Sequence, residues 1–214
     1  MLRSNLLSAL TVAAAVAACG GQAAEDDMEE LDHSAMEGQA AVAGELVCRP
    51  TATGSDLAGR SSPYDSATIA VGEGQAKVCY SRPALRGRTM IGGEAVPYDT
   101  LWRTGANEPT IIHLSTAAEI AGMRVEPGSY SLYTVPRQGE EWTLIVNRST
   151  SQWGHELRYT PEVRAQEVGR AQVHVENVEQ PVEQFTIRAM EGGDTGLVIE
   201  WQNSRIHVPI SPAA

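Results

Sequence analysis

Short runs of alternating apolar and polar residues, separated by Gly- and Pro-containing turns, recur through residues 60–211. Residues 171–177 read AQVHVEN, in which Val173 and Val175 alternate with polar residues. Successive side chains of a β-strand point to opposite faces, so this pattern is typical of a strand with one buried face. Because long helical periodicity is missing, the sequence predicts an all-β domain over this range.

Turn residues and burial patterns extend this prediction to an architecture. GEG (72–74) lies between two alternating runs and predicts a hairpin in which glycine supplies a positive φ. Residues 141–147, EWTLIVN, are apolar on both faces, as expected of a central strand between two layers. We therefore predict a single antiparallel β-sandwich, jelly-roll-like, with one short helix at residues 160–166. The expected strands are 67–71, 75–80, 110–115, 119–125, 129–135, 141–147, 171–177, 184–189, 196–201 and 205–210.

The N-terminal segment predicts export. Residues 1–18, MLRSNLLSALTVAAAVAA, combine Arg3, a short apolar run and small residues before Cys19. The apolar run is shorter than the roughly 20 residues that a membrane-spanning helix needs. Because VAAC (16–19) resembles the bacterial lipobox, we expect a lipoprotein signal peptide, lipidation of Cys19 and attachment to the cell envelope. The absence of Asp after Cys19 favours the outer membrane, and an ordinary secretory peptide is the alternative.

An acidic tether is expected over residues 19–59. This segment holds nine acidic residues against one basic residue, Arg49, which leaves it at −8 of the formal net charge of −11. Low hydrophobicity and high charge predict disorder, and the negative charge argues against nucleic acid as a partner. Met28, His33 and Met36 are weak candidates for copper ligands, because thioether and imidazole suit copper(I) and copper(II).

Two of the three cysteines are expected to pair. With Cys19 assigned to lipid, Cys48 and Cys79 remain in an oxidising compartment where disulfides persist. A bond between them would fasten the end of the tether to an early strand. The alternative is two free thiols.

A set of motifs in a fixed order points to a known family. They are SPYDS (62–66), VCYSRP (78–83), GRTMIGG (87–93), VPYDTLWRTGANE (96–108), PGSYSLYTVP (127–136), EWTLIVN (141–147), QWG (152–154) and WQNSRIHVPI (201–210). Their order and spacing over residues 62–210 resemble the DUF2911 family of domains of unknown function. The resemblance implies a mostly bacterial, usually exported, β-rich domain, and it transfers no activity.

No sequence motif identifies a reaction or a cofactor. GEGQAK (72–77) lacks the spacing of a phosphate-binding loop, GxSxG and HExxH are missing, and a dispersed Ser-His-Asp triad leaves no local signal. Outward histidines on the expected strands, His113, His174 and His207, favour separate surface residues over a metal site. We therefore expect neither a cofactor nor a metal in the folded domain.

Arginine and aromatic residues form the remaining candidate site. Guanidinium groups bind carboxylates and phosphates, and aromatic faces stack on sugar rings. The leading hypothesis is a binding or structural module with an Arg/Trp-lined surface for a small anionic ligand, a glycan or a protein. A second is a hydrolase or isomerase in which Glu108 or Asp99 is the base; the third is metal handling by the tether. A purely structural corner is the alternative for the site itself. The candidate residues are Arg82, Trp102, Arg103, Asn107, Glu108, Tyr133 and Trp153.

Overall fold

The computed structural model describes residues 45–50, 55–193 and 195–213. The predicted signal peptide (1–18), Cys19 and the Met28/His33/Met36 group lie outside these residues, as does most of the predicted tether. The described residues all belong to one compact unit.

The described residues form an almost entirely β structure, as the alternation predicted. Nine strands make one antiparallel sheet in the order β1-β2-β3-β6-β7-β8-β9-β4-β5. Helical segments are limited to single turns within this part of the chain. The elements are α1 (Ser55–Ala58), β1 (Tyr64–Val71), β2 (Gly74–Ser81), β3 (Thr110–Leu114), β4 (Ala118–Ile120), β5 (Met123–Val125), β6 (Gly128–Val135), β7 (Glu141–Asn147), η2 (Glu156–Arg158), α2 (Pro161–Arg164), β8 (Glu167–Ala189) and β9 (Gly196–Pro212).

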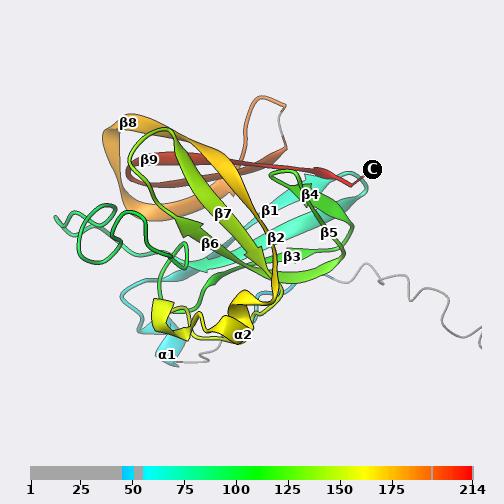
Figure 1. Cartoon of the computed structure of the whole chain (residues 1–214), viewed down its shortest axis with the longest axis horizontal. Helices are drawn as coiled ribbons and strands as arrows, with labels where there is room; N and C mark the ends of the chain where they lie inside the picture. The colour runs from blue at the N-terminus through cyan, green and yellow to red at the C-terminus, as the bar shows by residue number, and fades with distance from the viewer. Residues whose placement is uncertain (1–44, 51–54, 194, 214) are drawn as a thin grey trace, which may run out of the picture. The chain divides into compact units, whose positions relative to one another are not determined.

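The sheet folds over at β8, which gives the predicted sandwich-like arrangement. The first part of β8 pairs with β7, and the part from Val175 onward pairs with β9. Figure 1 shows β8 and β9 side by side as a long bent ribbon. Phe185 of β8 and Trp201 of β9 then meet Tyr80 of β2 and Trp102 in the core. The two indole rings stack 5.5 Å apart, so the core is built around aromatic contacts.

Five predicted strands differ from the observed ones: 119–125 is divided, whereas 171–177 and 184–189 both belong to β8, and 196–201 and 205–210 both belong to β9. The run 119–125 is interrupted at Ala121 and Gly122, where φ is 48° and 79°, and the chain turns back as the β4–β5 hairpin. Two successive positive φ angles suit the tight turns that match strand twist. The apolar positions change phase here, from Ile120 to Met123 and Val125, so the Ala121-Gly122 pair marks a turn that the single-strand prediction misses.

The predicted pair 196–201 and 205–210 is also wrong, because both runs belong to one strand, β9. Gln202 lies at the bend, with a φ of 53°. Its side-chain Oε1 accepts hydrogen bonds from the backbone N–H groups of Met90 (2.8 Å) and Ile91 (3.1 Å). These long-range bonds hold the bend and keep the polar residues at 202–204 within the strand instead of in a turn.

The segment between β7 and β8 covers the outer face of the sheet. Tyr133 of β6 and Ile145 of β7 are paired neighbours, and both are buried although they face away from the main core. Within this segment α2 is the helical turn predicted near residue 160, and the Thr160 side chain accepts a hydrogen bond from Val163 N. The covering explains why β7 is apolar on both faces.

The disulfide between Cys48 and Cys79 is confirmed, with a Cα–Cα distance of 5.7 Å. Cys79 lies on β2, between β1 and β3 in the sheet. The bond therefore fastens residues 45–50 to an interior strand.

Candidate functional site

The structure places Trp102 and Tyr133 below the surface. Trp102 is 3% exposed, stacks on Trp201, and its indole Nε1 donates to Gly105 O at 3.1 Å. Tyr133 is 1% exposed, and burial raises the pKa of its hydroxyl. Both rings therefore shape the site from beneath, and any contact they make with a ligand is indirect.

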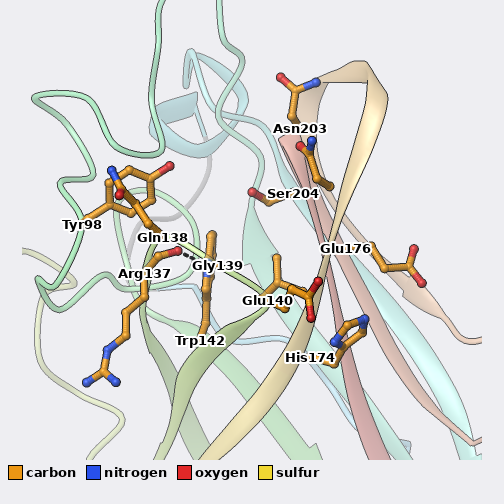
Figure 2. Close-up of a pocket in the computed structure, with 12 residues that line it drawn as sticks. Tyr98, Arg137, Gln138, Gly139, Glu140, Trp142, His174, Glu176, Asn203 and Ser204 are labelled. Atoms are coloured by element: carbon orange, nitrogen blue, oxygen red, sulfur yellow. Dashed lines mark hydrogen bonds between the residues drawn. The ribbon is translucent and has the colours of Figure 1, made fainter.

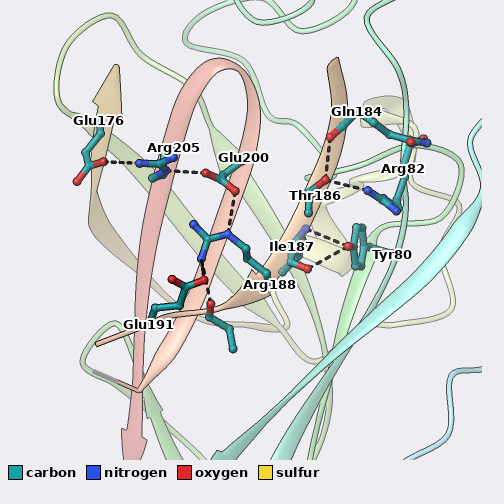
Figure 3. Close-up of polar contacts among 11 residues, drawn as sticks. Tyr80, Arg82, Glu176, Gln184, Thr186, Ile187, Arg188, Glu191, Glu200 and Arg205 are labelled. Carbon is teal, nitrogen blue, oxygen red and sulfur yellow. Dashed lines mark hydrogen bonds and ion pairs between the residues drawn. The ribbon is translucent and has the colours of Figure 1, made fainter. Parts of the chain in front are cut away.

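Arg82 joins the two layers of the fold. Its guanidinium donates to Asp65 Oδ2 of β1 at 3.0 Å and to two acceptors on β8, Phe185 O at 3.1 Å and Thr186 Oγ1 at 2.9 Å. Figure 3 shows Arg82 beside Thr186. The donors of Arg82 are thus divided among groups of the scaffold, so its role here is structural.

Glu108 forms a bidentate ion pair with Arg60. Its Oε2 and Oε1 accept from Arg60 Nη1 and Nη2 at 2.7 and 2.8 Å, and the two side chains are 7% and 11% exposed. Tyr64 lies in the same field: burial first, and then the Glu108 charge, raise its pKa to about 12. We refer to the Arg60–Glu108 pair as the clamp, because it ties the start of the domain to the loop before β3.

Arg103 extends from this loop toward η2. Its Nη1 lies 3.5 Å from Glu156 Oε1, a partner that the sequence did not suggest, since Asp99 and Glu108 were the nearby carboxylates. Its Nε is buried and has no hydrogen-bond partner among the residues that the structure describes. One long contact therefore leaves most of the donors of this guanidinium uncommitted.

The backbone that carries Arg103 is strained. Thr104 has a φ of 54° and Asn107 a φ of 62°, and a β-branched residue such as Thr is an outlier in the left-handed region. Thr104 is fully buried, and its hydroxyl lies 3.1 Å from that of Thr134. Such strain persists only where the surroundings fix it, and it concentrates at functional sites.

The QWG motif docks on the same loop. Gly154 N donates to Asn107 O at 3.2 Å, and a Cβ on Gly154 would overlap with Asn107 O and Arg103 Cδ. Only glycine fits this approach, so Asn107, Arg103 and Gly154 form one packed unit. The unit holds the adjacent Trp153 at the surface, with its side chain 45% exposed.

An open groove of about 470 Å³ surrounds Trp153 and is lined by Trp153, His155, Leu157 and Arg158. Leu157 is 83% exposed, which makes it and Trp153 two of the three large exposed apolar residues in the described part of the chain. Together with Arg103, which reaches η2 at Glu156, these four residues are called the Trp153 surface below. Four of the seven predicted site residues, Arg103, Asn107, Glu108 and Trp153, thus lie on this packed unit or immediately next to it.

A polar network supports the Trp153 surface from below. Gln152 Nε2 donates to the Tyr133 hydroxyl at 3.0 Å, and Gln152 Oε1 accepts from Ser149 Oγ at 2.7 Å. Asn147, at the end of β7, donates to Val163 O at 2.7 Å and so anchors the far side of the covering segment. The network fixes Gln152, the residue before the exposed Trp153. The sequence does not predict it, because its members come from separate segments of the chain.

A cavity of about 640 Å³ contains none of the seven predicted residues. It lies at the other end of β7, where the turn before β7 faces β8 and the middle of β9 (Figure 2). Polar and apolar groups contribute about equally to its walls, and the buried Trp142 lines it, with Nε1 donating to Arg137 O at 3.0 Å. This cavity is not the predicted site, because the predicted arginine and tryptophan residues do not line it.

Two histidines that the sequence treated as separate come together. The imidazole rings of His174 and His207 lie 6.4 Å apart, whereas His113 contacts Ser129 and His155 caps η2. Within residues 45–50, 55–193 and 195–213, no group of three or more His, Cys, Asp or Glu stands ready to hold a metal ion.

These features define an all-β, disulfide-linked, sandwich-like domain with a groove beside Trp153 on the segment between β7 and β8. The chain belongs to the family described as Protein of unknown function (DUF2911), whose family model matches residues 62–210. Comparison with curated proteins and with solved structures found no match. Among the described residues, no helix combines the length and apolar character needed to cross a membrane.

Proposed function

We propose that this protein is a lipid-anchored envelope protein whose domain binds a small anionic glycan at the Trp153 surface. The observation that carries the proposal is the pairing of an exposed indole with an arginine that has uncommitted donors, both held by one strained loop. An aromatic face suits a sugar ring, and a guanidinium suits a carboxylate or phosphate on that sugar.

Exposure of Trp153 and Leu157 supports binding over a purely structural role. A tryptophan that serves only packing is buried, as Trp102 and Trp142 are in this same domain. Trp153 instead leaves nearly half of its surface in solvent, beside His155 and Arg158. Aromatic residues of this kind supply rigid contact area at low entropic cost.

Arg103 supports an anionic group on the ligand. Its contact with Glu156 is 3.5 Å long, and Glu156 itself is partly exposed. A ligand carboxylate can displace Glu156 and accept two parallel N–H bonds, which are shorter and stronger than the contact they replace. The packed unit of Asn107, Gly154 and Arg103 holds the guanidinium in place before the ligand arrives, which lowers the entropic cost of binding.

The hydrolase or isomerase alternative gains no specific observation. Both oxygens of Glu108 already bind Arg60, and Asp99 is an exposed side chain 3.5 Å from Arg137. A general base needs a tuned pKa and access to a substrate proton.

Titration with carboxylated sugars tests the binding site. Glucuronate should stabilise the protein in a thermal melt, and glucose, its uncharged counterpart, should do so far less. Trp153→Ala and Arg103→Lys should each weaken glucuronate binding at least fivefold, because they remove the ring face and the guanidinium fork. Val47→Ala, which removes an exposed apolar side chain outside the groove, is the matched control. Equal glucuronate binding by wild type and both site variants would refute the proposed site.

The lipid anchor needs a separate test. Several acyl chains at Cys19 would retain the protein at a membrane, whereas one chain gives only marginal attachment. Cys19→Ala should move the protein from the membrane fraction to the soluble fraction of the producing cells. Retention of the variant at the membrane would contradict lipid anchoring without affecting the glycan proposal.

A further inference from the structure

Three adjacent strands place a row of metal-ligating residue types on one face of the sheet. Glu141 of β7 is the Cα partner of His174 on β8. Val175 is the partner of Ile206 on β9, and this antiparallel register continues to set His174 opposite His207. Directly opposite residues project to the same face, so both imidazoles leave the sheet together, with ring centroids 6.4 Å apart.

A second carboxylate, that of Glu176, lies beside the two imidazole rings. Glu176 lies two residues beyond His174 on the same strand face, and its Oε1 is 3.2 Å from His207 Nε2. That nitrogen is buried and makes no hydrogen bond of good geometry within the described part of the chain. Figure 2 places Glu140, His174 and Glu176 along one side of the 640 Å³ cavity.

Further concavities meet at the same residues. His174 and His207 line a hollow of about 370 Å³ together with Met190. Met190 and His207 also line a neighbouring hollow of about 230 Å³, which includes Glu176. Solvent and ions therefore reach the row from more than one side, and a thioether lies within the same surface region.

We propose that the His174–His207 pair binds a divalent first-row transition-metal ion, such as Zn²⁺ or Cu²⁺, and that Glu176 moves to become the third ligand, because the three side chains are not already arranged around one ion position. Imidazole nitrogens and carboxylate oxygens are preferred ligands of both ions. Directly opposite Cβ atoms in an antiparallel pair are about 5 Å apart, so rotation of both rings about χ1 and χ2 lets one nitrogen of each face a shared ion. His174 is exposed, and in this proposal the ligands assemble on binding.

The surrounding charges favour a cation at this position. Glu141 flanks the row on β7, and Glu140 is the residue before it. Arg205, the nearest cation, is drawn toward Glu200 on β9, with its Nε 2.6 Å from Glu200 Oε1. Figure 3 shows this ion-pair chain running from Glu176 through Arg205 to Glu200 and Arg188. A metal ion would take over Glu176 while Arg205 keeps its shorter bond to Glu200.

Zn²⁺ titration of the full chain tests the site, with a chromophoric chelator as competitor. Zinc is the better probe because it does not bind the methionines outside the described residues well. His174→Ala and His207→Ala should each weaken Zn²⁺ binding at least tenfold, and Glu176→Gln should weaken it severalfold. His113→Ala, a histidine on β3 outside this row, is the matched control and should bind as wild type does.

The outcomes separate this site from a background site and from misfolding. If His174→Ala and His207→Ala bind Zn²⁺ as tightly as wild type, the proposal is overturned. Loss of all binding in His33→Ala would overturn it equally, because the ion would then lie outside the folded domain. His174 is exposed, so its variant should keep the wild-type circular dichroism spectrum while losing the Zn²⁺-induced rise in melting temperature.

Discussion

Glu108→Gln should destabilise the domain by about 3 kcal/mol, because it leaves the Arg60 guanidinium charged and poorly paired at a largely buried position. Arg60 and Glu108 are 11% and 7% exposed, and they share two hydrogen bonds of 2.7 and 2.8 Å. Removing one partner of a buried pair costs about 3–5 kcal/mol. The lower end applies here, because solvent still reaches the edge of Arg60 and the amide retains one acceptor oxygen.

The double variant separates the pair interaction from the loss of each side chain. Arg60→Met combined with Glu108→Gln removes the buried charge as well as its partner, so it should be less destabilised than the sum of the two single variants. The expected coupling is about 2 kcal/mol, within the range of contacting residues. That value is a large fraction of a total stability of roughly 5–15 kcal/mol.

Urea unfolding followed by tryptophan fluorescence is the assay. The midpoint should fall in each single variant with the denaturant slope unchanged, since the native state keeps the same buried surface. The same variants should weaken glucuronate binding, because Glu108 adjoins Asn107, whose carbonyl holds Gly154 and the Trp153 surface. Single variants within 0.5 kcal/mol of wild type, or additive effects in the double variant, would refute the clamp.

Three further predictions follow from contacts at the edges of the fold. Cys48→Ser should destabilise the domain by about 3.5 kcal/mol in the chain-entropy estimate, because the bond to Cys79 spans a sequence separation of 31 residues. In thermal melts, reductant should lower the melting temperature of wild type and leave that of the variant unchanged. The pKa of Tyr64 is raised to about 12 in the native state, whereas a tyrosine in the unfolded chain ionises near pH 10. The contribution of Tyr64 to the free energy of unfolding is therefore present below pH 10 and lost as the pH rises to about 12. Over that window the free energy of unfolding should fall more steeply in wild type than in Tyr64→Phe. Gly154→Ala should cost about 1–3 kcal/mol by overpacking against backbone, whereas Gly169→Ala meets only the flexible Met123 side chain and should cost much less by the same urea assay.

Local pattern was enough to predict most strands and failed where a bend depends on distant contacts. The β1–β2 hairpin follows from GEG, and Gly72 has the expected positive φ of 57°. The bend in β9 follows from hydrogen bonds between Gln202 and a loop more than 100 residues earlier. Nothing near Gln202 in the sequence distinguishes such a bend from a turn.

The candidate site was predicted only in part, because its motifs are local whereas its ion pairs join distant segments. Residues 103–108 and QWG are distinctive motifs, and the structure packs them together through Gly154. The ion-pair partners of Arg103 and Glu108, by contrast, are 53 and 48 residues away. The pairing of His174 with His207 depends on strand register, which alternation alone leaves undetermined.

The position of the disulfide determines how the domain bears tension. A pulling force on residues before Cys48 passes through the bond to β2, which has hydrogen-bonded neighbours on both sides. The hydrogen bonds of β2 to both β1 and β3 must then break together. After reduction, the same force passes along the chain beyond Arg60 to β1, an edge strand that can peel from β2 one residue pair at a time. We therefore expect reduction of the Cys48–Cys79 bond to change the mechanical failure of the domain from shearing to unzipping.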